Sequence, residues 1–205
     1  RQQVALGAQV IKYMSTGGVL SNVSGGLGRA MTDEEMKAIV DTAHGLGRKV
    51  ATHSHGVAGT KAAIAAGVDT IDHGSFLDDE AIRAMKTHGT WLVPTMMAPA
   101  GALAFARAGV LPPATIPKAE EAAAAAFASH SKAYAAGVKV AFGTDSGVSK
   151  HGDNAKEFAM MVKAGMTPAQ ALKAATVNAA EALGRASSIG TIEPGKDADI
   201  NAVAG

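Results

Sequence analysis

The stretch AHGLGRKVATH, residues 43–53, joins the end of an expected helix to a short apolar strand through glycine. The same order returns at 65–74 (AAGVDTIDHG), at 86–95 (KTHGTWLVPT) and at 135–145 (AAGVKVAFGTD). Glycine can end a helix in the left-handed conformation without steric cost. The runs that follow are short and rich in β-branched or aromatic residues, as in strands buried on both faces of a parallel sheet. The repeat therefore predicts an α/β fold in which strands and helices alternate.

Helices are expected between the strands, and three of them have recognisable starts. Thr32 and Asp78 each precede acidic residues, and Thr167 precedes Pro168 at a first helical turn. Side-chain oxygens at such positions cap free backbone amides, and acidic residues favour the positive end of the helix dipole. The longest expected helix covers about 113–136, where alanine, a strong helix former, predominates.

Five strands follow from this pattern, too few to close an eight-stranded (β/α) barrel. They are the runs 50–53, 68–72, 91–95 and 138–142, together with one that ends at Lys12. The segment GTIEPGKDADI, residues 190–200, differs in character and is expected to form a strand pair with Pro194 and Gly195 at the bend. We therefore expect a partial barrel over 1–186 and the start of a small accessory β-sheet over 187–205.

The composition excludes several classes of protein. Hydrophobic residues make up 47% of the 205 residues and charged residues 18%, which favours one large domain with a buried core. The net charge is +1 without a clustered basic face, so nucleic acid is not an expected partner. The sequence has no apolar run of about 18 residues, which argues against a membrane partner. Cysteine is absent, so a metal would need His, carboxylate or modified Lys ligands. A cytoplasmic location is favoured, and export stays open.

Four residues able to bind or bridge a metal ion stand where predicted strands end. They are Lys12 in VIKYMSTGG, His53 in VATHSHG, His73 in TIDHG and Asp145 in VAFGTDSG. Each follows an apolar run and precedes a turn that contains Gly or Ser. In a (β/α)₈ barrel the carboxyl ends of the strands meet on one face, and that face holds the active site. The four side chains are therefore candidate members of one metal site.

Each of these residues also has a purely structural alternative. A single His is more often structural, Asp145 could be an ordinary turn residue, and Lys12 could extend from a barrel mouth into water. Because an ammonium group cannot bind a cation, Lys12 could join a metal site only after losing a proton or forming a carbamate with carbon dioxide. Four further histidines are expected to have structural roles: His44, His88, His130 and His151.

The order of these motifs resembles that of the amidohydrolase superfamily, most closely its Xaa-Pro dipeptidase (prolidase)-like and imidazolonepropionase-related branch. The resemblance extends from Ile11 to about Ala204. It rests on IKYMSTGGVLS, VATHSHG, GVDTIDHGSFLDDE, FGTDSG, GMTPAQALKAATVNAAEALG and GTIEPGKDAD, in that order. It implies strands four to eight of a parallel (β/α) TIM barrel, the C-terminal half of the family's pattern. The His-x-His pair that the family carries on strand one has no counterpart here.

The resemblance also implies a role for each candidate. Lys12 corresponds to a carboxylated lysine that bridges two metal ions, and His53 and His73 correspond to ligands of the more buried ion. Asp145 corresponds to a ligand that also moves a proton. His55 matches a position that contacts the substrate carbonyl in some relatives, so an electrophilic or oxyanion role and a structural role both stay open. Zn²⁺ is the default ion, although Mn²⁺, Co²⁺ and Fe²⁺ suit the same ligands.

The implied function is metal-dependent hydrolysis of an amide or peptide bond, in a dipeptide or an N-acyl amino acid. A metal-activated hydroxide would attack, with Asp145 as the proton shuttle. One alternative is a cyclic amide hydrolase of the imidazolonepropionase type, and another is a catalytically inert half-barrel that only folds or associates. Because unpaired barrel edges favour pairing, the expected partners are a second copy or a complementing N-terminal half, besides the small-molecule substrate. A phosphate-binding barrel is disfavoured, since no phosphate loop is present.

Overall fold

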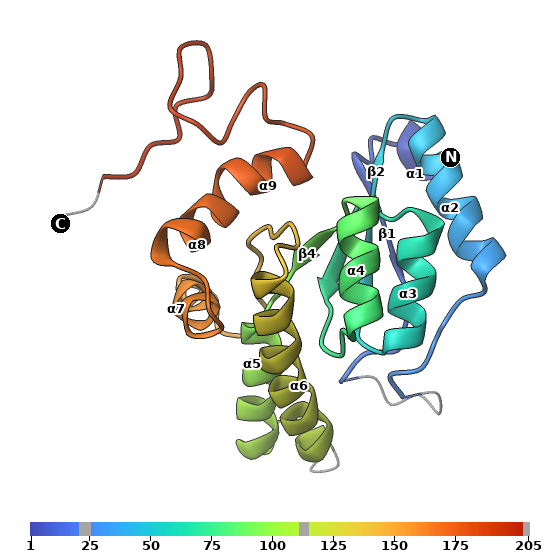
Figure 1. The fold of residues 1–205 in the computed structure, drawn as a ribbon, viewed down its shortest axis with the longest axis vertical. Helices are drawn as coiled ribbons and strands as arrows, with labels where there is room; N and C mark the ends of the chain where they lie inside the picture. Colours follow the sequence, from blue (N-terminus) through green and yellow to red (C-terminus); the bar gives the residue numbers. More distant parts are fainter. Residues whose placement is uncertain (21–25, 111–114, 203–205) are drawn as a thin grey trace.

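The computed structural model describes residues 1–20, 26–110 and 115–202 (Figure 1). Its strands are β1 (Val10–Met14), β2 (Lys49–Ser54), β3 (Thr70–His73) and β4 (Trp91–Val93). Its helices are α1 (Gln2–Ala5), α2 (Asp33–Gly45), α3 (Val57–Ala66), α4 (Asp79–His88), α5 (Met97–Arg107), α6 (Thr115–Ala135), α7 (Lys156–Lys163), α8 (Pro168–Ala175) and α9 (Val177–Ala182). The strands pair in parallel in the order β1-β2-β3-β4. The predicted parallel α/β architecture is confirmed.

The main core lies between the sheet and the helices α2, α3 and α4. Val50, Ile71 and Leu92, from three neighbouring strands, are fully buried. They belong to one apolar cluster with Ile64 of α3 and Met85 of α4. Because side chains alternate between the two faces of a strand, every second residue of each strand turns toward these helices.

The opposite face of the sheet is open. Val10 and Met14 of β1 are apolar, yet 41% and 45% of their surface is exposed. On the same face, Lys12 of β1 forms an ion pair with Asp72 of β3 at 2.7 Å, across the intervening strand β2. This face corresponds to the interior of a barrel, and the strand ends at its rim carry the candidate site.

The predicted helix starts are confirmed by their caps. Thr32 and Thr167 each form a reciprocal capping box with the residue three positions further on. Asp78 accepts a hydrogen bond from a backbone N–H in the first turn of α4. Helix α6 agrees with the long helix expected over 113–136, whose first two residues lie outside the described part. None of the described helices combines the length and the apolar character needed to cross a bilayer.

The strand expected over 138–142 is much shorter than predicted. It forms only a parallel bridge between Val140 and Leu92, and Leu92 exchanges backbone hydrogen bonds with both neighbours of Val140. The next bond of this ladder would run from the N–H of residue 94 to the carbonyl of Ala141, but Pro94 has no N–H to donate. The pairing with β4 therefore ends, and on the other side of the chain the N–H of Phe142 donates to the carbonyl of Ala174 in α8 at 3.0 Å.

The strand pair expected near the C-terminus is not formed, since residues 187–202 contain no strand. The chain bends there instead, with the Asp197 N–H donating to the Ser188 carbonyl at 2.9 Å. Ile192 is 85% exposed. A two-stranded unit is marginal unless an apolar face is covered by a neighbouring element, and this isoleucine has no such cover. The division of the chain near residue 186 stays a prediction.

Candidate metal site

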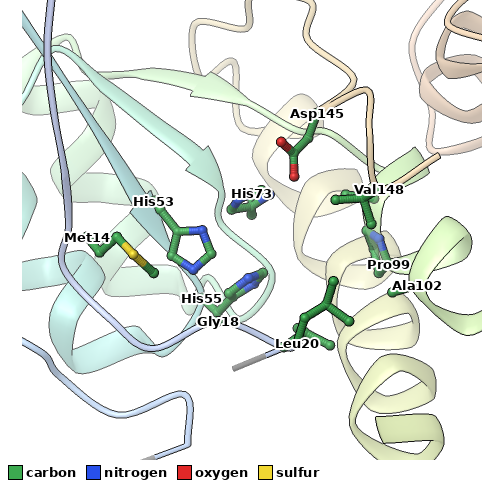
Figure 2. A pocket seen from close by; sticks show the side chains of 12 residues that line it. Met14, Gly18, Leu20, His53, His55, His73, Pro99, Ala102, Asp145 and Val148 are labelled. Carbon is green, nitrogen blue, oxygen red and sulfur yellow. The ribbon is translucent and has the colours of Figure 1, made fainter. Parts of the chain in front are cut away.

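Three imidazole rings meet where β2 and β3 end. His53 is the penultimate residue of β2, His55 lies just beyond it, and His73 ends β3. One nitrogen of each ring lies within 4.8 Å of the other two. The ring centroids are 4.5 Å apart for His53–His73, 4.6 Å for His53–His55 and 4.7 Å for His55–His73. Figure 2 shows the three rings turned toward one another. Converging imidazoles are a typical ligand set for a divalent transition metal.

A left-handed turn at His73 brings its ring into this cluster. Ile71 is buried beneath the helices, and Asp72 pairs with Lys12 on the open face. Regular alternation along β3 would return residue 73 to the helix side. Its φ is instead 73°, and its ring stacks on that of His55. The backbone conformation, rather than strand alternation, therefore positions the third imidazole.

Unusual backbone conformations gather at this site. Within the described residues, positive φ outside glycine occurs at His73, at Thr95 (45°) and at Asp145 (51°). Thr95 Oγ1 lies 2.6 Å from Nδ1 of His73, and Asp145 lines the same pocket as the rings. Such conformations cost about 1–3 kcal/mol each and persist where the surrounding structure holds them, often at functional sites.

Each ring uses one nitrogen for a protein hydrogen bond. His55 Nδ1 lies 2.8 Å from Ser75 Oγ, and His73 Nδ1 bonds to the hydroxyl of Thr95. His53 Nε2 makes a longer contact of 3.4 Å with the carbonyl of Gly17. That carbonyl can only accept, so Nε2 of His53 carries the proton and Nδ1 keeps its lone pair. One nitrogen of each ring is left for a ligand, as in metal sites whose histidines are oriented by outer partners.

The three imidazoles are neutral at pH 7. Burial lowers the pKa of His55 to about 3 and that of His73 to about 2, and the neighbouring rings add to the effect. The pKa of His53 is also lowered, mainly by burial. Loss of water disfavours the charged imidazolium in each case. A neutral imidazole has a lone pair to donate, so the electrostatics of the cluster fit cation binding.

The cluster forms one wall of a pocket of about 150 Å³. Asp145, an exposed residue, borders the same pocket (Figure 2). The remaining walls are mainly apolar and come from the end of β1, the loop after it, α5 and the loop after Asp145. These lining residues are Met14, Gly18, Val19, Leu20, Ala98, Pro99, Ala102 and Val148. The pocket thus places an apolar cavity beside three imidazoles and a carboxylate.

Lys12 lies outside the lining of this pocket. Its side chain is 55% exposed, and its Nζ pairs with Asp72. Its positive charge still contributes to the lowered pKa of His53 and of His73. Of the four predicted metal residues, the structure gathers His53, His73 and Asp145 around the pocket and leaves Lys12 beside it. It adds His55 to the imidazole cluster.

One protein family matches the whole chain: the amidohydrolase family, over residues 1–205. The chain belongs to the amidohydrolase family. This confirms the family resemblance of its motifs and identifies the parallel α/β sheet as part of an amidohydrolase barrel.

This amidohydrolase is similar to known hydrolases over nearly all of its length. Ochratoxinase from Aspergillus niger is 38% identical over an alignment of 210 positions, which covers 99% of this chain and 42% of the relative. A solved Xaa-Pro dipeptidase with methionine bound in its active site is 43% identical, with a TM-score of 0.89, over 97% of this chain and 49% of that one. Imidazolonepropionase from Geobacillus kaustophilus is 64% identical over 36 residues, only 18% of this chain. The amidohydrolase chain spans less than half the length of the first two.

The sequence analysis missed the residues that orient the imidazoles. Ser75 and Thr95 bond to the rings, and Asp72 pairs with Lys12. His130, for which a structural role is expected, donates through Nε2 to the carbonyl oxygen of His73 at 2.6 Å. No spacing in the sequence marks these residues, because their partners lie one or more strand–helix units away.

Proposed function

We propose that this chain carries part of the active site of a metal-dependent hydrolase that cleaves an amide or peptide bond. The observation that carries the proposal is the group of three neutral imidazoles within 4.8 Å of one another, with Asp145 on the same pocket. The similarity to ochratoxinase and to a Xaa-Pro dipeptidase supports the same reaction class.

The donor set fits a divalent transition metal, with Zn²⁺ as the first candidate. The described cluster offers three imidazole nitrogens, and the chain has no cysteine to add a thiolate. His53 and His73 would hold the ion together with Asp145. A carboxylated Lys12 would supply oxygen ligands to this ion and to a second one. A bound divalent ion would act as a Lewis acid on the scissile carbonyl and on the attacking water.

The residues of the chain would then bind the substrate and move the proton. Asp145 is exposed at the pocket, so its carboxylate can accept a proton from water and return it to the leaving amine. His55 is held by Ser75 through Nδ1, which leaves Nε2 to face the substrate carbonyl or to act as a further ligand. We favour contact with the substrate carbonyl, because His55 matches a position that makes this contact in some members of the family that the sequence resembles.

The apolar pocket walls favour a substrate with an apolar group next to the scissile amide. A dipeptide or an N-acyl amino acid fits this description, in keeping with the dipeptidase and the ochratoxinase to which the chain is similar. A cyclic amide of the imidazolonepropionase kind is the alternative, supported by a short local match. The second alternative is an inert half-barrel, because the chain spans less than half the length of these relatives.

Metal analysis and an amide-hydrolysis assay test the proposal together. The chain is loaded with Zn²⁺, its metal content is measured, and it is assayed with Xaa-Pro dipeptides, N-acyl amino acids and a cyclic amide. We expect bound zinc and turnover of one acyclic class. Asp145→Asn should reduce kcat about 10²- to 10⁴-fold and leave the fold intact, because Asp145 is exposed.

Asp41→Asn is the matched control, since Asp41 is an exposed carboxylate of α2 paired with Lys37. It should retain full activity. A folded, zinc-loaded chain that hydrolyses none of the amides would overturn the hydrolase proposal for this chain and support the inert half-barrel. Turnover of the cyclic amide alone would overturn the assignment of an acyclic substrate.

A further inference from the structure

Two polar residues of α6 form hydrogen bonds with the turn that carries His73. His130 and Ser129 are both buried. His130 Nε2 lies 2.6 Å from the carbonyl oxygen of His73. The Ser129 hydroxyl lies 3.2 Å from the carbonyl oxygen of Gly74 and 3.0 Å from that of Ser75. Two donors from one helix turn therefore face three successive carbonyls, and the single hydroxyl proton of Ser129 can serve only one carbonyl at a time, with that of Ser75 the nearest.

The direction of the bond between His130 and His73 is unambiguous. A carbonyl oxygen can only accept, so Nε2 of His130 carries the proton and donates it. Burial lowers the pKa of His130 to about 4, so the ring is neutral at pH 7. Its Nδ1 then has no proton, and within the described residues this atom has no hydrogen-bond partner. The hydrogen bond that Nε2 donates to the carbonyl of His73 therefore orients this ring.

The peptide unit between His73 and Gly74 is held from both sides. Its carbonyl accepts from His130, and its N–H, that of Gly74, donates to the Ser54 carbonyl at 2.9 Å. The plane of this peptide sets ψ of His73, a residue already at a φ of 73°. Non-glycine residues rarely adopt that region, so the conformation depends on such contacts.

We propose that His130 is a positioning residue for the imidazole cluster. By its hydrogen bond to the carbonyl of His73, His130 holds His73 in its left-handed conformation. The inference rests on the proposed metal site. His130 touches no other ring of the cluster; it acts through the backbone of His73. Ser129 supports the same turn at Ser75, whose hydroxyl bonds His55. One side of α6 therefore sets the orientation of two of the three imidazoles.

Without the donor, the buried carbonyl of His73 would lose its partner, which favours rotation of the peptide unit. Rotation would move the imidazole away from His53 and His55. The expected result is weaker metal binding, about 10-fold or more, as is usual when a partner that orients a metal ligand is lost.

Variants at position 130 separate this role from simple packing. His130→Phe keeps an aromatic ring and removes the donor. His130→Gln places an amide N–H near the original Nε2, whereas His130→Asn places it nearer the original Nδ1. Tyr134→Phe is the matched control, because Tyr134 lies one turn further along α6 and stacks beside His130 at 6.2 Å between centroids.

Zinc affinity, measured by competition with a chromogenic chelator, and the visible spectrum of the Co²⁺-loaded chain are the main measurements. We expect His130→Phe and His130→Asn to weaken Zn²⁺ binding about 10-fold or more and to alter the Co²⁺ bands. His130→Gln and Tyr134→Phe should behave as the wild type. Unchanged affinity and spectrum in His130→Phe, with only a lower melting temperature, would show a structural role and overturn the inference.

A measurement on the metal-free chain keeps the test independent of the proposed function. Amide hydrogen exchange at Gly74 reports on the peptide unit directly, because this N–H is bonded to Ser54. Its exchange should accelerate at least about 10-fold in His130→Phe and stay unchanged in Tyr134→Phe. Equal exchange in the two variants would reject the positioning role. A wild-type chain that binds no zinc would instead reject the proposed metal site.

Discussion

At the scale of single residues, Lys12 differs from expectation in its position, because it is the middle residue of β1 and not its end. The family resemblance implies a carboxylated lysine, whereas here Lys12 pairs with Asp72 at 2.7 Å. Carboxylation replaces a cation beside Asp72 by an anion, and two neighbouring anions repel each other. The carbamate should therefore form only when bound cations compensate for both charges.

This argument predicts that carboxylation of Lys12 depends on metal. With ¹³C-bicarbonate and Zn²⁺, a carbamate carbon signal should appear in the NMR spectrum, and it should vanish when the metal is chelated. Lys12→Arg should abolish the signal. Lys49→Arg is the control, because Lys49 is also a strand lysine paired with an aspartate, Asp69, and should keep it. A signal that survives in Lys12→Arg would contradict the assignment.

At the scale of secondary-structure elements, a buried carboxylate joins α7 to the first turn of α5. Both oxygens of Glu157 accept backbone N–H groups, from Met96 at 2.8 Å and from Met97 at 2.9 Å. The amides at a helix start have no partner within the helix, and a negative charge there is favourable. Since Ala98 and Pro99 of α5 line the pocket, Glu157 helps to fix one of its walls.

The stability of the protein should depend on the ionisation of Glu157. The loss of water on burial outweighs the two N–H bonds that favour the carboxylate, and it raises the pKa of Glu157 to about 7, above its ordinary value of 4.5. The folded state therefore holds the proton more tightly, so this contribution is fully present below about pH 4.5 and is lost as the pH rises through about 7. The loss is on the order of 3 kcal/mol.

Urea unfolding of the wild type and of Glu157→Gln between pH 4.5 and 8 measures this effect, since glutamine keeps the size but cannot titrate. The free energy of unfolding of the wild type should fall with rising pH relative to that of the variant. A constant difference between the two across this range would show that Glu157 does not titrate there.

At the scale of the whole molecule, the open face of the sheet is the dominant feature. Val10 and Met14 expose apolar surface on it, and β1 is an edge strand of the described sheet. Exposed edges and apolar faces favour pairing with another chain.

We expect the chain to associate in solution. Val10→Glu should shift it toward the monomer, whereas Leu172→Glu, which changes an exposed leucine of α8, should not. Sedimentation equilibrium measures the association state of the wild type and of both variants. A monodisperse wild-type monomer would contradict this expectation.

Much of the fold could be predicted from local patterns. Caps such as Thr32 and Asp78, and apolar runs that end in turns, depend on residues close together in the chain. The short pairing at Val140 was harder to predict, because it depends on the register between two distant segments, which places Pro94 where the next N–H donor of the ladder would have to be.

The amino-acid sequence alone determined the parallel α/β class, the family and the strand ends at which His53 and His73 stand, since these follow from short-range signals repeated along the chain. The tertiary structure alone decided that His55 joins the imidazole cluster, that Lys12 pairs with Asp72, and that α6 reaches the carbonyl of His73. The physical reason is that hydrogen bonds, ion pairs and burial depend on distance in space, and these partners are brought together only when the helices pack around the sheet.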